Sequence, residues 1–257
     1  MALAARERLS VCTYNLWNTQ RWPAREPALR QFLECFTPDV LDTQELRAET
    51  RDCIDDVLTE HDRVADAFIG WTNESNIWWR SDRFAYVEHG AADYGSHEAS
   101  RRLFWVRLCV QGSDRTCVMA TAHLTHQSHP DEATTGASPR IHQTRAILDT
   151  MAAQVRPGEP AWVMGDFNDA LHPTRLLHTA GYTSCYTDLA VQPPPTFPAL
   201  PTASRAAVEP LFNVCYDWIT ANAYARAICA QTPHCFYGDR APSDHWPVVA
   251  VYELVQG

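Results

Sequence analysis

Two short polar stretches decide the fold: GDFND at residues 165–169 and SDHWP at residues 243–247. Each lies against an apolar run that is typical of a strand, AWVM at 161–164 before the first and VVAVYEL at 248–254 after the second. Acids, amides and a histidine at strand ends are typical of catalytic sites, because loops on a rigid scaffold often carry function. The two stretches therefore predict a site at the end of a sheet.

Four further pieces of the same kind lie earlier in the chain or between these two. They are TYNLW at 13–17, QE at 44–45, AHL at 122–124 and YDWI at 216–219. In this order, the six pieces resemble those of the endonuclease/exonuclease/phosphatase (DNase I-like) superfamily, and the resemblance spans nearly the whole chain. It implies a four-layer α/β sandwich, with two mixed β-sheets packed face to face, helices outside and the catalytic residues at one end.

The length of the chain, 257 residues, allows one large α/β domain or two small ones. A content of 46% hydrophobic and 20% charged residues is ordinary for a globular protein. The six pieces extend from Asn15 to His245, so one site must gather both ends of the chain. We therefore expect a single catalytic domain over residues 1–257.

The charge of the chain limits its partners. The net charge is -10, and all 21 basic residues are Arg. Arg suits bidentate recognition of phosphate, although a genome rich in G and C, or removal of Lys, explains the bias more simply. The acidic balance argues against extended nonspecific tracking along duplex DNA, which needs a large basic face.

The nine cysteines include no CxxC pair and lie mainly in apolar, strand-like runs such as 108–110 and 115–118. We interpret them as reduced core residues, with a loop disulfide between Cys229 and Cys235 as the alternative. Residues 1–10 have no signal-like apolar region, and no apolar run approaches membrane length. These features favour a cytoplasmic protein without a transmembrane segment, which we expect to be a monomer.

Hydrophobic periodicity predicts alternating strands and helices, with hairpins in the middle of the chain. Helices are expected at 26–36, 48–58, 140–154 and 173–179. Strands are expected at 9–14, 40–43, 76–79, 84–88, 103–110, 116–122, 161–164, 182–186, 216–220 and 248–254. Residues 125–139 are expected to form a surface loop, and the Pro-rich segment 192–210 is expected to lack regular structure.

Hydrolysis of a phosphate ester needs a cation, an activated water and help for the leaving oxygen. Glu45 offers a hard oxygen ligand for Mg²⁺ or Mn²⁺, and the resemblance makes it the principal metal ligand. Asn15 would lie beside it if the two strands are neighbours, where its amide could bind metal or a phosphate oxygen. Asp244 resembles a metal-proximal carboxylate. Many relatives carry an Asp where this chain has Trp17, which favours a single metal ion.

The GDFND stretch predicts a carboxylate and an amide that act together. Asp166 and Asn168 are two residues apart, so in an extended backbone they face the same side. There they could orient a water and stabilise the pentacoordinate phosphate. Gly165 permits close backbone approach, whereas Asp169 fits a turn or a helix cap.

Two histidines complete the predicted catalytic set. The resemblance pairs His245 with Asp217, and the carboxylate would fix the imidazole tautomer and raise its basicity. His123 matches the histidine with which relatives bind a phosphate oxygen or protonate the leaving group, and Glu74 is its candidate partner on a loose alignment. The sequence does not decide whether Asp166 or the His245–Asp217 pair deprotonates the water.

Other histidines and tryptophans have simpler interpretations. Histidines 126, 129, 142, 172 and 178 lack a zinc-type spacing and are interpreted as solvated. Tryptophans 78, 79, 105 and 162 lie in strand patterns and are expected in the core. Trp22 and Trp71 lie in predicted loops and could contact substrate.

The leading prediction is a Mg²⁺- or Mn²⁺-dependent phosphoesterase that hydrolyses phosphodiester bonds by direct attack of water, with nucleic acid as the first choice of substrate. One alternative is a lipid or small-molecule phosphoesterase, of a sphingomyelinase-like or inositol-phosphate phosphatase type. Another is a catalytically silent binding scaffold on the same fold. The presence of every predicted acid and histidine favours activity.

Overall fold

Two six-stranded sheets pack face to face in the computed structural model, which describes residues 7–199 and 214–255. Sheet A contains, in spatial order, β11 (Ala225–Gln231), β12 (Val248–Leu254), β1 (Arg8–Asn15), β2 (Val40–Gln44), β4 (Ile77–Arg80) and β3 (His61–Arg63). Sheet B contains β5 (Phe84–Ala92), β6 (Leu103–Val110), β7 (Thr116–His123), β8 (Ala161–Asp166), β10 (Asp217–Ala221) and β9 (Thr183–Ser184). Both sheets are mixed, because the β1–β2 and β7–β8 pairs are parallel and their other pairs are antiparallel.

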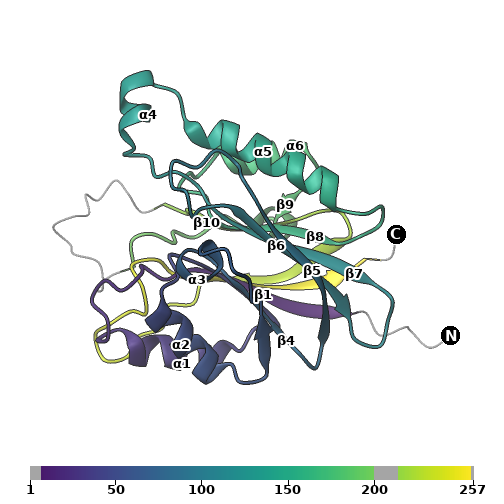
Figure 1. Ribbon diagram of the computed structural model, residues 1–257, viewed down its shortest axis with the longest axis horizontal. Helices are drawn as coiled ribbons and strands as arrows, with labels where there is room; N and C mark the ends of the chain where they lie inside the picture. The colour runs from purple at the N-terminus through teal and green to yellow at the C-terminus, as the bar shows by residue number, and fades with distance from the viewer. Residues whose placement is uncertain (1–6, 200–213, 256–257) are drawn as a thin grey trace.

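Helices cover the outer face of each sheet. The longer helices are α1 (Glu26–Phe36), α2 (Ala48–Val57), α5 (Pro139–Gln154) and α6 (His172–Thr179), and the short ones are α3 (Gly70–Asn73), α4 (Pro130–Thr135) and α7 (Cys185–Asp188). Figure 1 shows α1 and α2 outside sheet A, and α5 and α6 outside sheet B. The predicted four-layer sandwich is therefore confirmed.

Strand β1 shows how side-chain alternation builds the core. Leu9 and Val11 belong to the hydrophobic cluster that includes residues of both sheets, whereas Cys12 and Tyr14 pack with residues of α1 and α2. Successive side chains of a strand point to opposite faces. The same alternation turns Asn15 toward sheet B, where it meets β8.

A small polar network lies inside this apolar sandwich. Thr13, Gln44 and Thr121 all donate to Asp42 Oδ1, at 2.7, 2.6 and 2.8 Å. Burial raises the pKa of Asp42 to about 7, although these three hydrogen bonds act in the opposite direction. The network joins β1 and β2 of sheet A to β7 of sheet B.

Several elements differ from the prediction. The strand expected at 182–186 is only β9, because the side chain of Ser184 accepts from Thr187 N and starts α7 there. The segment expected to be a loop at 125–139 contains α4, which has Pro130 in its first turn and Gly136 in a left-handed conformation at its end. Strands β3 and β11 and helix α3 were not predicted.

Trp71 corrects one prediction. It lies in α3 with only 1% of its surface exposed and packs edge-on against Phe104, so it is a core residue and cannot contact substrate. Cysteines 12, 53, 117, 185 and 215 are buried and all nine are free, so Cys229 and Cys235 form no disulfide. No described helix has the length and apolar character needed to span a bilayer. Most of the Pro-rich segment, residues 200–210, lies outside the described residues.

Candidate active site

The register of sheet B brings three predicted residues side by side. Asp166 is the last residue of β8, and its Cα partners are His123, the last residue of β7, and Asp217, the first of β10. Because the three strands are neighbours, these side chains meet at one end of the sandwich. Hydrogen bonding between strands thus unites residues from positions 123, 166 and 217.

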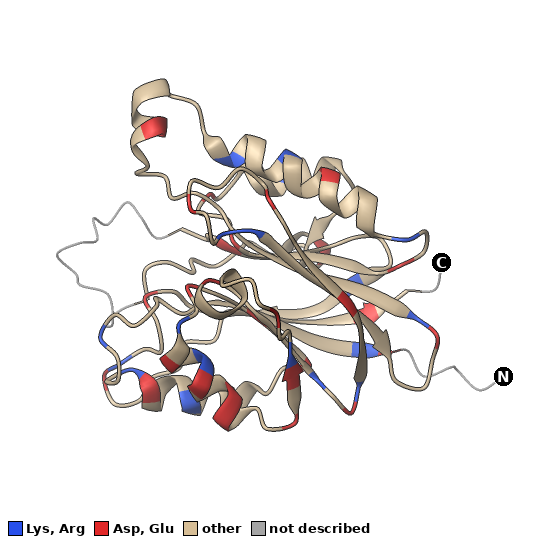
Figure 2. Ribbon diagram, in the orientation of Figure 1, with Lys and Arg blue, Asp and Glu red and all other residues tan. Residues whose placement is uncertain are grey.

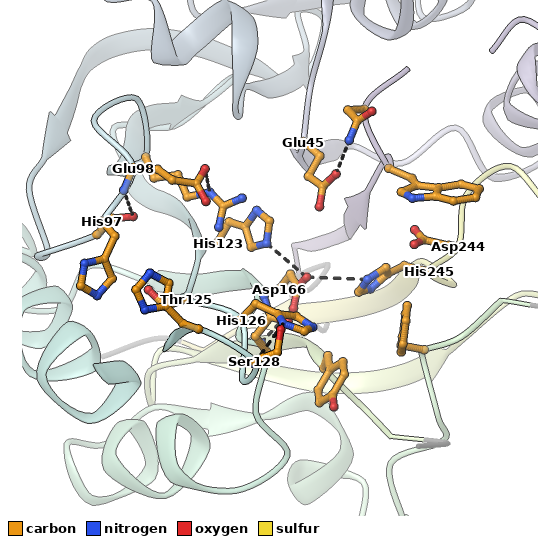
Figure 3. A pocket seen from close by; sticks show the side chains of 18 of the residues that line it. Glu45, His97, Glu98, His123, Thr125, His126, Ser128, Asp166, Asp244 and His245 are labelled. Carbon is orange, nitrogen blue, oxygen red and sulfur yellow. Dashed lines mark hydrogen bonds and ion pairs between the residues drawn. The ribbon is translucent and has the colours of Figure 1, made fainter. Parts of the chain in front are cut away.

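Asp166 is the centre of the site. Its Oδ2 accepts a hydrogen bond from Asn15 at 2.9 Å and lies 3.5 Å from His123 Nε2 and 3.8 Å from His245 Nε2. Its Oδ1 accepts the backbone N–H of Asn168 at 2.8 Å. Burial alone would raise the pKa of Asp166, but the charges of His245 and His123 and these hydrogen bonds leave the pKa below its usual value. Asp166 is therefore a charged carboxylate at neutral pH, and Figure 3 shows it between His123 and His245.

His123 is held by a carboxylate and an arginine behind it. Its Nδ1 donates to Glu74 Oε1 at 3.1 Å, so its Nε2 is the nitrogen that faces Asp166. Arg101 Nε lies 2.8 Å from the same Glu74 oxygen and 2.9 Å from Glu98. Burial raises the pKa of Glu74, but His123 and Arg101 outweigh it, and the pKa is lowered. Glu74, the candidate partner from the loose alignment, thus contacts His123 in the structure.

His245 is held in the same manner from the other side. Its Nδ1 donates to Asp217 Oδ2 at 2.8 Å, as predicted, and its Nε2 faces Asp166. Burial lowers the pKa of His245, but the charges of Asp217 and Asp166 raise it well above the usual value. The pKa of Asp217 is raised by its burial and by the charge of Asp166, and its buried Oδ1 has no hydrogen-bond partner in the described part of the chain. The free site therefore contains an imidazolium between carboxylates.

Glu45 and Asp244 form a second acidic group in the same pocket. Glu45 Oε2 accepts from Asn18 at 2.9 Å, and its Oε1 lies 3.4 Å from the Asn15 amide nitrogen. Burial and the charge of Glu45 are among the causes that raise the pKa of Asp244 to about 6. Two half-buried carboxylates that repel each other are a donor set that suits a hard divalent cation.

Asn15 lies beside Glu45 as predicted, but its orientation favours a positioning role. Its amide nitrogen donates to Asp166 and Glu45, whereas its oxygen, the atom that could ligate a metal, accepts the backbone N–H of Trp17 at 3.0 Å. The amide therefore links the two acidic groups.

Asp166, Asp217 and His245 offer ligand atoms that all lie within 4.8 Å of one another, and such a group could also hold a metal. Its three members are fully buried, and His245 and Asp217 already share a hydrogen bond of 2.8 Å. Metal binding there would break this bond and displace a proton from His245. Glu45 and Asp244 require no such change, so they are the better pair for the cation.

The backbone around the pocket is strained. Trp17, Asn18, Glu45 and Asn168 line the pocket with φ angles of 55°, 40°, 54° and 49°, in the left-handed region that L-residues rarely adopt. Asn168 therefore does not continue an extended strand from Asp166. Strand alternation, the reason given for expecting the two side chains on the same side, is thus wrong. Both side chains nevertheless line the pocket, because the chain turns after β8.

Gly165 has a specific steric role. Its φ is 129°, and a Cβ at this position would lie 2.0 Å from the carbonyl oxygen of Ala122. Strands β7 and β8 can therefore approach closely only with glycine here, as the sequence predicted. This contact sets the positions of His123 and Asp166, the residues that follow.

The pocket has a volume of about 600 Å³ and is lined by all the predicted site residues except Asn15 and Asp217, which lie behind it. The sequence left Arg101 open as a phosphate contact or a solvated charge, and it did not predict Asn18, Phe197 or Tyr216 as lining residues. Asn18 follows the quoted TYNLW stretch directly, which was the available signal. Phe197 packs against His245 with ring centroids 4.9 Å apart, and nothing in its Pro-rich surroundings indicated that contact.

Solved structures similar to this chain define its fold class. One is an endonuclease/exonuclease/phosphatase family protein of Bacteroides thetaiotaomicron, with 18% identity, 97% of this chain and 98% of that chain covered, and a TM-score of 0.77. The second is D. rerio TDP2 complexed with a single-strand DNA product, with 17% identity, coverage of 96% and 99%, and a TM-score of 0.78. The third is a Bacteroides thetaiotaomicron mannosyl-6-phosphatase, with 20% identity, coverage of 96% and 99%, and a TM-score of 0.77.

The chain thus has the fold of the endonuclease/exonuclease/phosphatase superfamily, and the predicted resemblance is confirmed at this level. No protein-family model matches the sequence, and no curated protein matches it either. At identities of 17–20%, the likeness establishes the fold alone. The chemistry has to be argued from the site.

Proposed function

We propose that the protein is a divalent-metal-dependent phosphoesterase that hydrolyses a phosphodiester by direct attack of water. The observation that carries the proposal is the convergence of two histidine–carboxylate pairs on Asp166. The set combines a charged carboxylate with imidazole groups whose free nitrogens face one point. It can orient water and bind phosphate oxygens around that point.

Glu45 and Asp244 are the residues expected to hold the metal, with Asn15 and Asn18 orienting Glu45. Both carboxylates offer the hard oxygen ligands that Mg²⁺ and Mn²⁺ prefer. When bound, the ion would supply positive charge for the phosphate oxygens as negative charge develops on them. It would also relieve the repulsion between the two carboxylates that is among the causes of the raised pKa of Asp244.

The remaining groups divide the proton chemistry. Asp166 is charged and solidly hydrogen-bonded, so it orients the attacking water and accepts its proton. His245, protonated in the free site, donates its Nε2 proton to the leaving oxygen as the P–O bond to that oxygen breaks, while Asp217 holds the other nitrogen. His123 Nε2 approaches the phosphate from the opposite side. No side chain has to form a covalent intermediate.

A nuclease-like activity on single strands is the substrate class that we favour. One structural neighbour is TDP2 with a single-strand DNA product, and Trp17 and Phe197 give the pocket here partly exposed aromatic rings on which bases can stack. Figure 2 shows Arg interspersed with Asp and Glu along α1 and α2, which argues against tracking on duplex DNA.

A small phosphoester is the second candidate, supported by a different observation. Among the described residues that line the pocket, Arg101 is the only Arg, and Glu74 and Glu98 already bind it. A long polyanion would find few cationic contacts in such a pocket, whereas a small substrate needs only the central groups. A mannosyl-6-phosphatase among the structural neighbours has the same fold. The intact set of acids and histidines favours either activity over a silent scaffold.

The test is a substrate panel of oligonucleotides, small phosphodiesters and phosphomonoesters with Mg²⁺, Mn²⁺ or a chelator. Wild type is compared with H245A and with H142A, which removes an exposed histidine on α5. Metal-dependent diester cleavage in wild type and H142A, lost in H245A, supports the proposal. Monoester release would establish the second candidate, and turnover in the chelator at the full rate would refute the metal-dependent mechanism.

A further inference from the structure

A group of metal-binding side chains lies at the rim of the pocket, outside the centre described above. His97 Nε2 lies 3.5 Å from Asp131 Oδ2, and His129 Nδ1 lies 3.8 Å from the same oxygen. One ligand atom from each of the three residues lies within 4.8 Å of the other two. Spacing along the chain did not predict this group, because His97 and His129 belong to separate loops.

We propose that His97, His129 and Asp131 bind a divalent transition-metal ion, Zn²⁺ in the first instance, as a second metal site independent of Glu45 and Asp244. Two imidazoles and one carboxylate prefer zinc and related ions, whereas Mg²⁺ prefers oxygen ligands alone. Zinc sites with three protein ligands keep an open position. The proposed site goes beyond the phosphoesterase function and does not depend on it.

Buried residues of α5 hold the two loops together. Gln143 accepts from Thr125 N at 3.0 Å, donates to Thr125 Oγ1 at 2.6 Å and donates to Gly95 O at 3.2 Å. The buried Arg140 donates to Thr125 O at 2.8 Å and to Glu132 in α4 at 2.7 Å. The backbone around the three proposed ligands is therefore fixed before any ion arrives, which reduces the entropic cost of binding.

Only side-chain movements are needed to complete the site. The rings of His97 and His129 stack with centroids 4.1 Å apart and an angle of 10°, and an ion binds in the plane of an imidazole, so at least one ring must turn. The side chains are 42% and 29% exposed, and that of Asp131 is 62% exposed, which leaves room to turn. His129 Nδ1 also accepts from Asp131 N at 3.3 Å, a long hydrogen bond that is cheaply replaced.

The location suggests what the ion does. His97 and His129 both line the pocket, and Figure 3 shows His97 at the end of the pocket away from His245. An open coordination position there faces a bound substrate. If the proposed phosphoesterase function holds, the ion binds an oxygen of a second anionic group, such as a neighbouring phosphate, across the pocket from the reacting one.

Zn²⁺ titration of the full chain by calorimetry, in excess Mg²⁺, tests the site without any substrate. The variants are H97A, H129N and D131N, with H142A as the matched control; Asn at position 129 retains a good helix-capping residue. We expect each variant to bind one Zn²⁺ fewer than wild type, or to bind it more than about 100-fold more weakly, because even an outer-shell partner contributes about 10–100-fold. H142A should match wild type.

Co²⁺ provides a second readout, because its visible absorption reports coordination geometry. The absorption assigned to this site should appear in wild type and H142A and be lost in H97A. Equal Zn²⁺ stoichiometry and affinity in H97A and H142A would overturn the proposal and leave the cluster as a stacked histidine pair beside a carboxylate.

The substrate role has a separate test that fails independently. Addition of Zn²⁺ should lower KM for a substrate with a second phosphate in wild type, and this zinc-dependent fall in KM should be lost in H97A. An unchanged KM in wild type, with zinc bound, would reject the substrate role. Absence of any turnover would instead reject the proposed function and leave the zinc site standing.

Discussion

The two histidine–carboxylate pairs that face Asp166 look alike but differ in what stands behind them. Behind His123, Glu74 shares its charge with Arg101, and its pKa is lowered. Behind His245, Asp217 has no arginine partner among the described residues, its Oδ1 accepts no hydrogen bond from them, and its pKa is raised. A neighbouring arginine therefore contributes to the opposite pKa shifts of these two buried carboxylates.

The largest fall in activity is expected for substitutions in the His245–Asp217 pair. H245A should lower kcat by about 10²–10⁴-fold, the usual contribution of a positioned proton-transfer group, and D217N should approach it because the imidazole loses its orientation. Steady-state kinetics with the diester substrate measure both, and circular dichroism verifies the fold. If H123A lowered kcat far more than H245A, the assignment of roles to the two sides would be reversed.

The next prediction concerns the divalent metal ion that we propose for Glu45 and Asp244. E45Q removes one of the two mutually repelling carboxylates, so the metal concentration for half-maximal activity should rise by about 10–100-fold, with activity partly restored at high metal. Activity is measured across a Mg²⁺ titration, and E49Q on α2 serves as the control because Glu49 is exposed. An unchanged metal requirement in E45Q would exclude Glu45 as a ligand.

A third substitution, at Arg101, would make the Glu74–His123 pair more like the Asp217–His245 pair. R101Q removes the cation that holds the Glu74 charge, so His123 should lose part of its fixed orientation. We expect about a tenfold fall in kcat, smaller than for H245A, with a pH–rate profile that changes shape. An R102Q variant is the neighbouring control, because the side chain of Arg102 lies 3.9 Å from Asp93, outside the Glu74 pair. Identical pH profiles for wild type and R101Q would show that Arg101 is not a positioning residue.

The last prediction is on stability instead of activity and concerns Asp42, a buried carboxylate that accepts three hydrogen bonds and makes no ion pair with any described residue. Its pKa is about 7 in the folded protein, against about 3.9 in an unfolded chain. The folded state therefore binds more protons between these values, and the stability from this group is present below pH 4 and is lost as pH rises through 7. The full shift corresponds to about 4 kcal/mol.

D42N should remove that loss, so the stability of D42N relative to wild type should increase from pH 5 to pH 8. Urea unfolding at both pH values measures the difference, with D62N at an exposed position of β3 as the control. A relative stability that is the same at both pH values would contradict the raised pKa.

The sequence predicted most of what depends on strand ends. Asp166, His123 and Asp217 could be identified because each lies at the end of an apolar run, and strand register then brings them together. The helix at 26–36 was predicted with its exact bounds, since its apolar spacing and Pro27 are local signals. Local patterns suffice where the structure is regular.

The remaining parts of the site depend on loop conformation. Asn18 reaches Glu45 because the backbone turns through left-handed angles at Trp17 and Asn18, which few sequence patterns signal. Arg101 and His97 reach the pocket through a loop that Gln143 ties to α5, a contact between residues 48 positions apart. Such contacts join residues that are far apart in the sequence, so spacing along the chain does not predict them.

The pairing of β1 with β12 places the first and last described strands side by side inside sheet A. Arg8 lies opposite Glu253, so the start of β1 and the end of β12 lie side by side. During synthesis, β1 can pair with β2 early, but it cannot pair with β12 until the chain through residue 254 has been made. Until β12 leaves the ribosome, one edge of β1 is an open template for other strands, and the nascent protein depends on that last strand both for a closed sheet and for the position of His245.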